Sequence, residues 1–497
     1  MSRTSSEPPR TVPEHADAHS DPTFWSLKKA AAAIARKSIS SRELTEACLN
    51  RIAKHDPFLN TFITLTAEQA LQAARQMDAE RARDRQRSPL HGIPLVLKDN
   101  IDTDGIRTTA ASALFADRVP TADAEIWRRL RAGGSVLLGK SNLHEFAAGS
   151  TNAVSHFGPV RNPWAPDRHC GGSSGGCAVA VIANFCFGAV GTDTGGSNRT
   201  PASYCGVTGF KPTYGRSSMR GIIPVSASLD HVGPITRSAE DAALMLDLMA
   251  GHDPLDPDSV AHPPGFYARA ISAAVDELRI GVPQAFYADP IDAEVLAAVN
   301  AALHQLEKLT RGRVDIALPA QAFGGMSIQV EMAAYHQPWY PSQADRYQAA
   351  TRKKLQRANE TLATTYIAEL RNMRLLRHHI HEWFKTVDIL VTPTTRHKPE
   401  RFADISPDSA VKREVPPSNT FPFNLLGLPT LSIPCGQFTD GIPIGLQITG
   451  APWAEAQVLA LAHAYEQHTH WHARRPPLAL LQSCRAGPSL HQTESAP

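Results

Sequence analysis

The sequence predicts an α/β protein in which helices enclose a largely central sheet. Short apolar runs, such as residues 92–98 and 188–193, indicate buried strands, and they alternate along the chain with helical patterns. Of the 497 residues, 42% are hydrophobic, which is enough to bury a large core. No apolar run approaches the ~18 residues that span a bilayer. A globular fold is therefore expected, with neither global disorder nor a membrane span.

The N-terminal region is predicted to be helical after a polar leader. Residues 1–22 are rich in Pro, Ser and Glu, so we expect a disordered leader there that is not a secretory signal. Ser40 and Glu43 form a capping box, which predicts a helix to about His55. An Ala-rich amphipathic pattern predicts a second helix over 67–86.

Helices and strands are predicted to alternate through the core of the domain, residues 90–240. Glycine and proline punctuate the apolar runs there and set the expected boundaries. The expected elements are a strand over 92–98 that ends near Lys98, a helix over 121–134, a strand over 135–139, a helix over 177–187 and a strand over 188–193.

The remainder is predicted to complete a single domain over 23–477. From about 285 to 385 the chain becomes helical and more polar, which indicates a helical insertion. Strands return over 386–450, and a closing helix follows. We expect residues 478–497 to form a frayed tail.

Charge and cysteine content exclude several classes of protein. Fifty Lys and Arg residues against 48 Asp and Glu residues leave a net charge of +2, without the basic excess of a nucleic-acid-binding protein. Seven cysteines with no C-x-x-C pair predict neither a disulfide framework nor a zinc site. Small buried thiols in a reducing compartment are the expected alternative. We therefore expect a cytoplasmic protein that does not bind nucleic acid directly.

Three short patterns match known motifs but lack their structural context. Residues 134–141 match the P-loop pattern, yet Ser-Val-Leu-Leu in the middle favours a strand over a phosphate-binding loop. Residues 171–175 match G-x-S-x-G, but two prolines upstream favour a loop where a nucleophile elbow needs a strand. Residues 381–385 begin like a zinc H-E-x-x-H motif but end in lysine. None of the three is expected to function as its motif does.

A fourth feature combines Lys98 in GIPLVLKDN, Ser173 in GGSSGG and Ser197 in GTDTGGSNRTPAS. A serine hydroxyl is a weak nucleophile until a base takes its proton. A lysine whose pKa is lowered by burial can be that base, and a second serine can pass the proton along. The backbone N–H groups of Thr194, Gly195, Gly196 and Ser197 suit a developing oxyanion.

These motifs, in this order, resemble the amidase signature family. The resemblance covers roughly residues 25–475 and is densest at 92–216. It implies an α/β/α sandwich with a central mixed, twisted sheet surrounded by helices. It also implies an amidase that hydrolyses the carboxamide C–N bond of a small molecule through a seryl acyl-enzyme, with release of ammonia or an amine. This chemistry requires no metal, nucleotide or organic cofactor.

The resemblance also implies a role for each site residue. Ser197 maps to the nucleophile, Ser173 to the proton relay after a cis peptide bond, and Lys98 to the base. The implied oxyanion hole is the backbone of Thr194, Gly195, Gly196 and Ser197. Supporting positions are expected at Ser174, Asp193 and Arg199.

One position departs from the family pattern, and several alternatives stay open. Asn198 follows the nucleophile where a branched apolar residue is usual, so local packing is expected to differ.

The chain also resembles the glutaminase component of glutamyl-tRNA amidotransferase, its A subunit, which would make it a glutaminase that needs a partner. A non-catalytic binding protein on the same scaffold is a third hypothesis. The sequence does not determine the oligomeric state, and a homodimer remains an open alternative.

Substrate choice is expected to depend on variable segments. The loop at 144–152, the segment at 325–345 and the helix at 371–384 are the predicted walls. The aromatic residues of MAAYHQPWY fit either a pocket lining or plain core. Arg374 and Arg377, three apart on one helical face, fit either an acidic substrate or a solvated surface.

Overall fold

The computed structural model describes residues 21–287, 290–317, 328–405 and 419–478. The predicted leader and tail fall outside these ranges, apart from Asp21, Pro22 and Leu478. In the described chain, eleven strands form one sheet that contains both parallel and antiparallel neighbours. In spatial order they are β1 (Phe62–Leu65), β3 (Val136–Ser141), β2 (Pro94–Lys98), β6 (Gly188–Asp193), β8 (His231–Thr236), β7 (Thr208–Lys211), β12 (Thr430–Gln437), β13 (Pro443–Gly450), β11 (Ile389–Pro393), β9 (Ile280–Pro283) and β10 (Arg313–Ile316).

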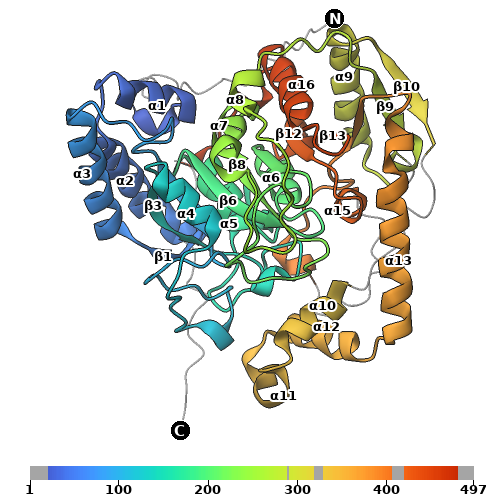
Figure 1. The fold of residues 1–497 in the computed structure, drawn as a ribbon, viewed down its shortest axis with the longest axis horizontal. Coiled ribbons are helices and arrows are strands. Elements are labelled where there is room, and N and C mark those ends of the chain that lie inside the picture. Colours follow the sequence, from blue (N-terminus) through green and yellow to red (C-terminus); the bar gives the residue numbers. More distant parts are fainter. Residues whose placement is uncertain (1–20, 288–289, 318–327, 406–418, 479–497) are drawn as a thin grey trace, which may run out of the picture.

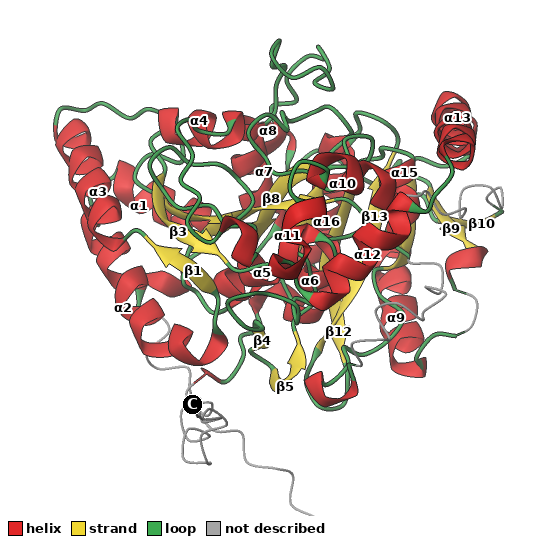
Figure 2. Cartoon of the chain, turned by 90° about the horizontal axis from the view of Figure 1, so that it is seen from below, coloured by secondary structure: helices red, strands yellow, loops and turns green. Residues whose placement is uncertain are grey.

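Helices surround this sheet, as Figures 1 and 2 show. One group, α5 and α6, packs on the central strands, and a second group, α7, α9 and α16, packs on β8, β12 and β13. The predicted α/β sandwich with a mixed central sheet is confirmed. The longer helices are α1 (Leu27–Ala35), α2 (Ser41–Leu59), α3 (Ala67–Ala82), α4 (Glu125–Ala132), α5 (Gly175–Ile182), α6 (Arg199–Cys205), α7 (Ala239–Met249), α9 (Ala293–Leu309), α10 (Ile328–His336), α12 (Ala349–Asn359), α13 (Ala363–His379) and α16 (Glu455–Gln467). The shorter ones are α8 (Tyr267–Ala270), α11 (Tyr340–Gln343) and α15 (Phe421–Leu425).

The central strands are buried on both faces. Every residue of β2, β3, β6 and β8 is buried, which explains why their sequences are nearly continuous apolar runs. Strand β2 pairs in parallel with β3 and with β6. Because parallel strands end at the same edge, the polar residues at the ends of β2 and β6 lie close together.

Most expected elements are present, with shifted ends. The capping box of Ser40 and Glu43 is formed with both of its hydrogen bonds, and α2 continues past the expected end to Leu59. The P-loop match at 134–141 lies on strand β3, which confirms that it is not a phosphate-binding loop. Its lysine, Lys140, is fully buried and paired with Asp99.

Three strands contradict the sequence-based expectation, and the first is β1, which lies in the N-terminal region that was predicted to be helical. Residues 165–169, expected to form a loop, make strand β5 (Ala165–His169), which pairs with β4 (Arg161–Asn162) in a separate two-stranded sheet. Pro166 is tolerated because this small ribbon gives a proline the edge position it requires. Strand β10 lies inside the expected helical insertion. Its four largely exposed residues at the sheet edge show no buried apolar pattern.

Helices α10, α11 and α12 gather at one end of the molecule (Figure 1). From there α13 runs along the outer edge towards β9 and β10. The residues of α10 and α12 pack with Phe146 and Val225 in a separate apolar cluster. This insertion therefore covers loops that lie next to the central strands.

Candidate active site

Strand β2 places Lys98 in the interior of the protein. Its side chain is fully buried, and Nζ lies 2.8 Å from Ser173 Oγ and 2.7 Å from Thr192 Oγ1. The Thr192 carbonyl oxygen is 3.4 Å away. Burial lowers the pKa of Lys98 to about 7, because the interior disfavours the ammonium more than nearby Cys177, Asp193 and Asp230 favour it. A substantial fraction of Lys98 is therefore neutral near pH 7.

Ser173 lies in the loop that leads from β5 into α5. The Gly172–Ser173 peptide bond is cis, as the resemblance implied. Ser173 is fully buried, and its carbonyl oxygen accepts a hydrogen bond from the backbone N–H of His144 at 3.2 Å. This contact joins the Ser173 loop to the segment at 144–152, one of the expected pocket walls.

Ser197 lies in the loop between β6 and α6. The backbone N–H of Ser174 donates to the Ser197 carbonyl at 3.2 Å, so the two serine loops are in direct contact. In the described chain, Ser197 Oγ makes no hydrogen bond, and the residue is 9% exposed. Structures without substrate often lack the tight contacts of a reacting complex. The structure therefore joins Lys98 directly to Ser173, and Ser197 to the Ser173 loop through the backbone.

One of the four expected oxyanion donors is already hydrogen-bonded within the protein. The Gly196 N–H donates to Asp193 Oδ1 at 2.7 Å. Within the described residues, the N–H groups of Thr194, Gly195 and Ser197 have no acceptor. These three are the donors still open to a ligand in this conformation.

Asp193 and Arg199 form a fully buried ion pair that braces the Ser197 loop. Arg199 donates to both Asp193 oxygens, at 2.9 and 3.0 Å. It also donates to Gln447 Oε1 and Asn424 Oδ1. Burial raises the pKa of Asp193, but the charge and hydrogen bonds of Arg199 outweigh it and hold that pKa below its ordinary value. Asp193 therefore stays ionised and receives the loop N–H groups as a carboxylate.

Ser174 and Asn198 contact each other between the two serine loops. Ser174 Oγ lies 3.1 Å from Asn198 Oδ1 and 3.0 Å from the Thr192 carbonyl. The Asn198 amide nitrogen donates to the carbonyls of Phe210 and Gly233. The unusual residue after Ser197 is thus fully buried with its polar atoms partnered.

Sequence reasoning missed Thr192 and Asp230. Thr194 Oγ1 donates to Asp230 Oδ1 at 2.5 Å, and Asp230 Oδ2 accepts the N–H groups of Val225 and Ser226. Burial raises the pKa of Asp230 to about 6. The local sequence SLDHVGP is mixed in polarity and does not mark Asp230 as buried.

The helical insertion is hydrogen-bonded to the segment that carries Asp230. Glu331 on α10 accepts from Ser226 Oγ, from Ser228 N–H and Oγ, and from Tyr366 on α13. Arg377 on α13 donates to the Ser228 and Leu425 carbonyls, so it is engaged with protein groups. Arg374, by contrast, is exposed. Residues 325–327 of the expected wall lie outside the described ranges.

The MAAYHQPWY segment is partly core, since Met332, Ala333 and His336 are buried, whereas its residues Tyr335, Trp339 and Tyr340 are half-buried. His336 contacts the ring of Phe146 with centroids 4.3 Å apart, and Tyr347 lies 5.5 Å from the same ring. His336 is fully buried, and burial lowers its pKa to about 4. Of the two interpretations left open, this packing favours plain core for His336.

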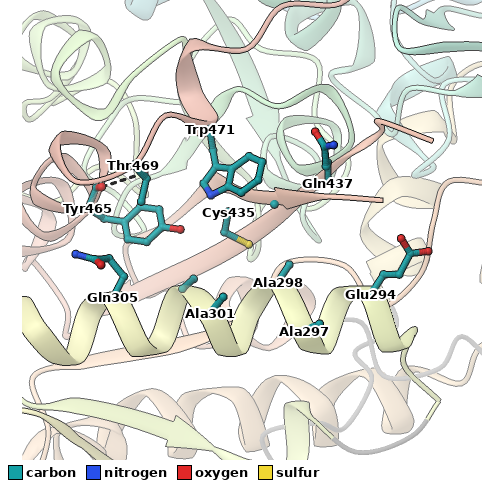
Figure 3. A pocket seen from close by; sticks show the side chains of 12 residues that line it. Glu294, Ala297, Ala298, Ala301, Gln305, Cys435, Gln437, Tyr465, Thr469 and Trp471 are labelled. Carbon is teal, nitrogen blue, oxygen red and sulfur yellow. Dashed lines mark hydrogen bonds between the residues drawn. The ribbon is translucent and has the colours of Figure 1, made fainter. Parts of the chain in front are cut away.

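A separate pocket of about 450 Å³ lies between α9, the end of β12 and the end of α16. Figure 3 shows Tyr465, Cys435 and Trp471 facing the alanine-rich side of α9. None of its lining residues is a predicted site residue, and none hydrogen-bonds to Lys98, Ser173 or Ser197. The pocket is therefore distinct from the candidate active site.

Two further features of the described residues concern the helices and the cysteines. Within them, no helix combines the length and apolar character that crossing a membrane requires. The six described cysteines are all free and buried. Cys484 lies outside the described ranges.

Comparisons with known proteins agree with this architecture. The family model Amidase matches residues 43–459. The A subunit of glutamyl-tRNA(Gln) amidotransferase from Moorella thermoacetica is 40% identical over 472 residues, which cover 90% of this chain and 96% of that protein.

Solved structures are similar over most of the chain. One belongs to a vestigial protein complex related to the origin of an s-triazine catabolic enzyme. It has a TM-score of 0.83 and 32% identity, and covers 89% of this chain and 98% of that one. The 6-aminohexanoate cyclic dimer hydrolase has a TM-score of 0.82 and 28% identity, and covers 92% and 99%. With a family model spanning most of its length and relatives aligned nearly end to end, the chain belongs to the amidase family.

Proposed function

We propose that this protein hydrolyses the C–N bond of a small carboxamide through an acyl-enzyme on Ser197. The observation that carries the proposal is the buried contact between Lys98 Nζ and Ser173 Oγ, 2.8 Å long, with the pKa of Lys98 lowered to about 7 by burial. A base with a pKa near the working pH is suited to accept and return a proton.

The proposed reaction begins when Ser197 Oγ attacks the amide carbonyl carbon. Its proton passes to Ser173 Oγ, whose own proton passes to Lys98 Nζ. The carbonyl oxygen becomes an oxyanion, for which the free N–H groups of Thr194, Gly195 and Ser197 are available. Losing one such donor typically costs ~2.7–4 kcal/mol of transition-state stabilisation.

The second half of the reaction reverses the proton path. Lys98 returns its proton through Ser173 to the leaving nitrogen, and the C–N bond breaks to release ammonia or an amine. Water then attacks the ester carbonyl and gives up a proton along the same path. Ser197 is regenerated as a hydroxyl and the carboxylic acid is released. Every proton is carried by residues of this chain, so the scheme calls on no cofactor.

A second candidate is favoured by the names of the relatives. The most similar curated proteins include A subunits of glutamyl-tRNA(Gln) amidotransferase, at up to 40% identity. In that case glutamine would be the amide, and the ammonia would be used in a complex with other subunits. The 6-aminohexanoate cyclic dimer hydrolase, a structural neighbour at 28% identity, supports the first candidate.

Ammonia release by the purified full chain tests both candidates. The panel contains aliphatic and aryl amides, ureas and glutamine, each with wild-type protein and Ser197→Ala. Turnover of a simple amide by the chain alone, lost in Ser197→Ala, is the expected result. Glutamine hydrolysis that appears only with the other subunits present would favour the second candidate. Equal turnover in Ser197→Ala would overturn the mechanism.

A further inference from the structure

Asn198 lies between the Ser173 loop and the Ser197 loop. The surrounding sequence gives no reason for an asparagine at this position. It is fully buried and follows Ser197 directly. Its backbone N–H donates to Asp193 Oδ2 at 3.2 Å, so its own main chain is part of the braced loop. Burying an amide group costs free energy unless its polar atoms are hydrogen-bonded. The hydrogen-bond partners of Asn198 therefore indicate what this residue does.

The orientation of the Asn198 amide follows from its neighbours. Its nitrogen lies 3.2 Å from the Phe210 carbonyl and 3.3 Å from the Gly233 carbonyl. Both of these groups only accept hydrogen bonds, so the NH₂ group must face them. The amide oxygen is thereby directed at the Ser174 hydroxyl, 3.1 Å away.

The space around this contact is also specific. A side chain at Gly191 would place its first carbon 2.3 Å from Asn198 Oδ1 and 2.9 Å from Ser174 Oγ. Real side-chain carbons essentially never approach that closely. Gly191 therefore leaves the room in which the Ser174–Asn198 hydrogen bond forms.

The Ser174 hydroxyl has one hydrogen and two acceptors within reach. It lies 3.0 Å from the Thr192 carbonyl and 3.1 Å from Asn198 Oδ1. Lys98 Nζ lies 3.4 Å from the same Thr192 carbonyl. A carbonyl oxygen can accept two hydrogen bonds, and each is weaker when the oxygen is shared. When the hydroxyl donates to Asn198, the Lys98 ammonium does not share the Thr192 carbonyl with a second donor.

We propose that Asn198 is a positioning residue: it takes the Ser174 hydrogen bond, holds the Ser173 loop against the Ser197 loop, and leaves the Thr192 carbonyl to Lys98. The inference rests on the proposed function, because it concerns how protons move between Ser197, Ser173 and Lys98. Asn198 itself touches none of the reacting atoms.

Labelling of Ser197 by a fluorophosphonate tests this without knowledge of the substrate. The second-order labelling rate is measured against pH for four full-length proteins: wild type, Asn198→Ala, Ser174→Ala and the double variant. Asn198→Ala is expected to label about tenfold more slowly, because it loses the Ser174 hydrogen bond between the two serine loops as well as the amide bonds to the Phe210 and Gly233 carbonyls. In the Ser174→Ala background the bond between the loops is already absent, so the same substitution is expected to slow labelling less than it does in wild type. Independent, multiplying effects would overturn the inference.

The pH profile gives a readout that simple destabilisation would not produce. In Asn198→Ala the Ser174 hydroxyl turns to the Thr192 carbonyl and competes with the Lys98 ammonium. The charged form of Lys98 is then less stabilised, so the acidic limb of the profile is expected to move to lower pH. The double variant removes the Ser174 hydroxyl, so its acidic limb is expected to return to the wild-type pH. A limb that stays unchanged in Asn198→Ala would overturn the inference.

Asn162→Ala is the matched control. Asn162 is also fully buried, and its amide nitrogen donates to the Tyr204 carbonyl at 3.2 Å. Its labelling rate and pH limb are expected to match wild type, and an equal slowing would overturn the inference. If Asn198→Ala does not fold, Ser174→Ala alone decides, since unchanged labelling there contradicts the proposal. Absence of labelling in wild type would overturn the proposed function and this inference with it.

Discussion

The Lys98 ammonium nitrogen lies 2.8 Å from the Ser173 hydroxyl oxygen, and both side chains are fully buried. Lys98 comes from the end of β2, whereas Ser173 comes from a loop 75 residues later in the chain. The parallel pairing of β2 with β6 brings Lys98 beside Thr192 at one edge of the sheet, and the Ser173 loop reaches the same edge, where Ser174 Oγ lies 3.0 Å from the Thr192 carbonyl. The contact therefore depends on the fold, and the proposed proton path depends on the contact.

The rate of Ser197 acylation is expected to rise as pH increases through about 7, because Lys98 must be neutral to accept a proton and burial lowers its pKa to about 7. Below that pH the ammonium form dominates and the rate falls. The measurement is kcat/KM, or the fluorophosphonate labelling rate, from pH 5 to 9.

Asp230 supplies the control for this pH limb. Burial raises the pKa of Asp230 to about 6, close enough to produce a limb of its own. Asp230→Asn cannot ionise, so a limb that persists in this variant belongs to Lys98. It is expected at lower pH than in wild type, because the Asp230 charge no longer favours the Lys98 ammonium. A rate that is independent of pH between 5 and 8 in wild type would contradict the role of Lys98 as base.

Breaking the Asp193–Arg199 pair is expected to destabilise the fold strongly. Either Arg199→Met or Asp193→Asn leaves its partner in a fully buried site without a counter-charge, at a typical cost of ~3–5 kcal/mol in the free energy of unfolding. Urea unfolding measures this free energy. The double variant is expected to cost less than the sum, since no lone charge remains. Single variants as stable as wild type would contradict the proposed brace.

The hydroxyl of Thr194 is expected to matter for rate. Thr194→Val removes the 2.5 Å hydrogen bond to Asp230 that holds the loop carrying the proposed oxyanion donors. A hydrogen bond to a charged group contributes ~1.5–3 kcal/mol, so kcat is expected to fall about tenfold or more. Thr194→Ser keeps the hydroxyl and is expected to retain most activity. Equal activity in both variants would contradict this role.

Glu466 on α16 is expected to make stability pH-dependent. It is buried, accepts from the N–H of Ala239 and from Thr208 Oγ1, and burial raises its pKa to about 8. The unfolded chain releases this proton near the ordinary value of 4.5. Between these values the folded state binds more protons, so the free energy of unfolding falls as pH rises.

Glu466→Gln removes this ionisation. The fall in unfolding free energy between pH 6 and 8 is expected to be smaller in the variant than in wild type. Denaturant titrations at four pH values compare the two proteins under the same conditions. Identical slopes would show that Glu466 does not change its protonation on unfolding in this range.

The sequence predicted the parts of the site that are encoded locally. Lys98 ends an apolar strand, and the glycine-rich segments around Ser173 and Ser197 carry distinctive patterns. The α/β fold class followed from the alternation of short apolar runs with helical patterns. By contrast, strand β10 is short and exposed at an edge, so no burial pattern marked it.

The local sequence pattern does not predict contacts between segments that are far apart in the chain. Lys211 looks like an ordinary surface lysine in KPTYGR, yet it is fully buried and donates to the Leu428 carbonyl. Burial lowers its pKa. The partners of Asn198 and Asp230 likewise come from other strands and loops. Only the three-dimensional arrangement reveals that these polar residues have partners.

The identity of the labelled residue tests the central claim most directly. Wild type, Lys98→Ala and Ser197→Ala are treated with a fluorophosphonate, and peptide mass spectrometry locates the adduct. The account predicts one adduct on Ser197 in wild type, much slower formation in Lys98→Ala, and none in Ser197→Ala. An adduct on Ser173 alone, or undiminished labelling in Lys98→Ala, would contradict it.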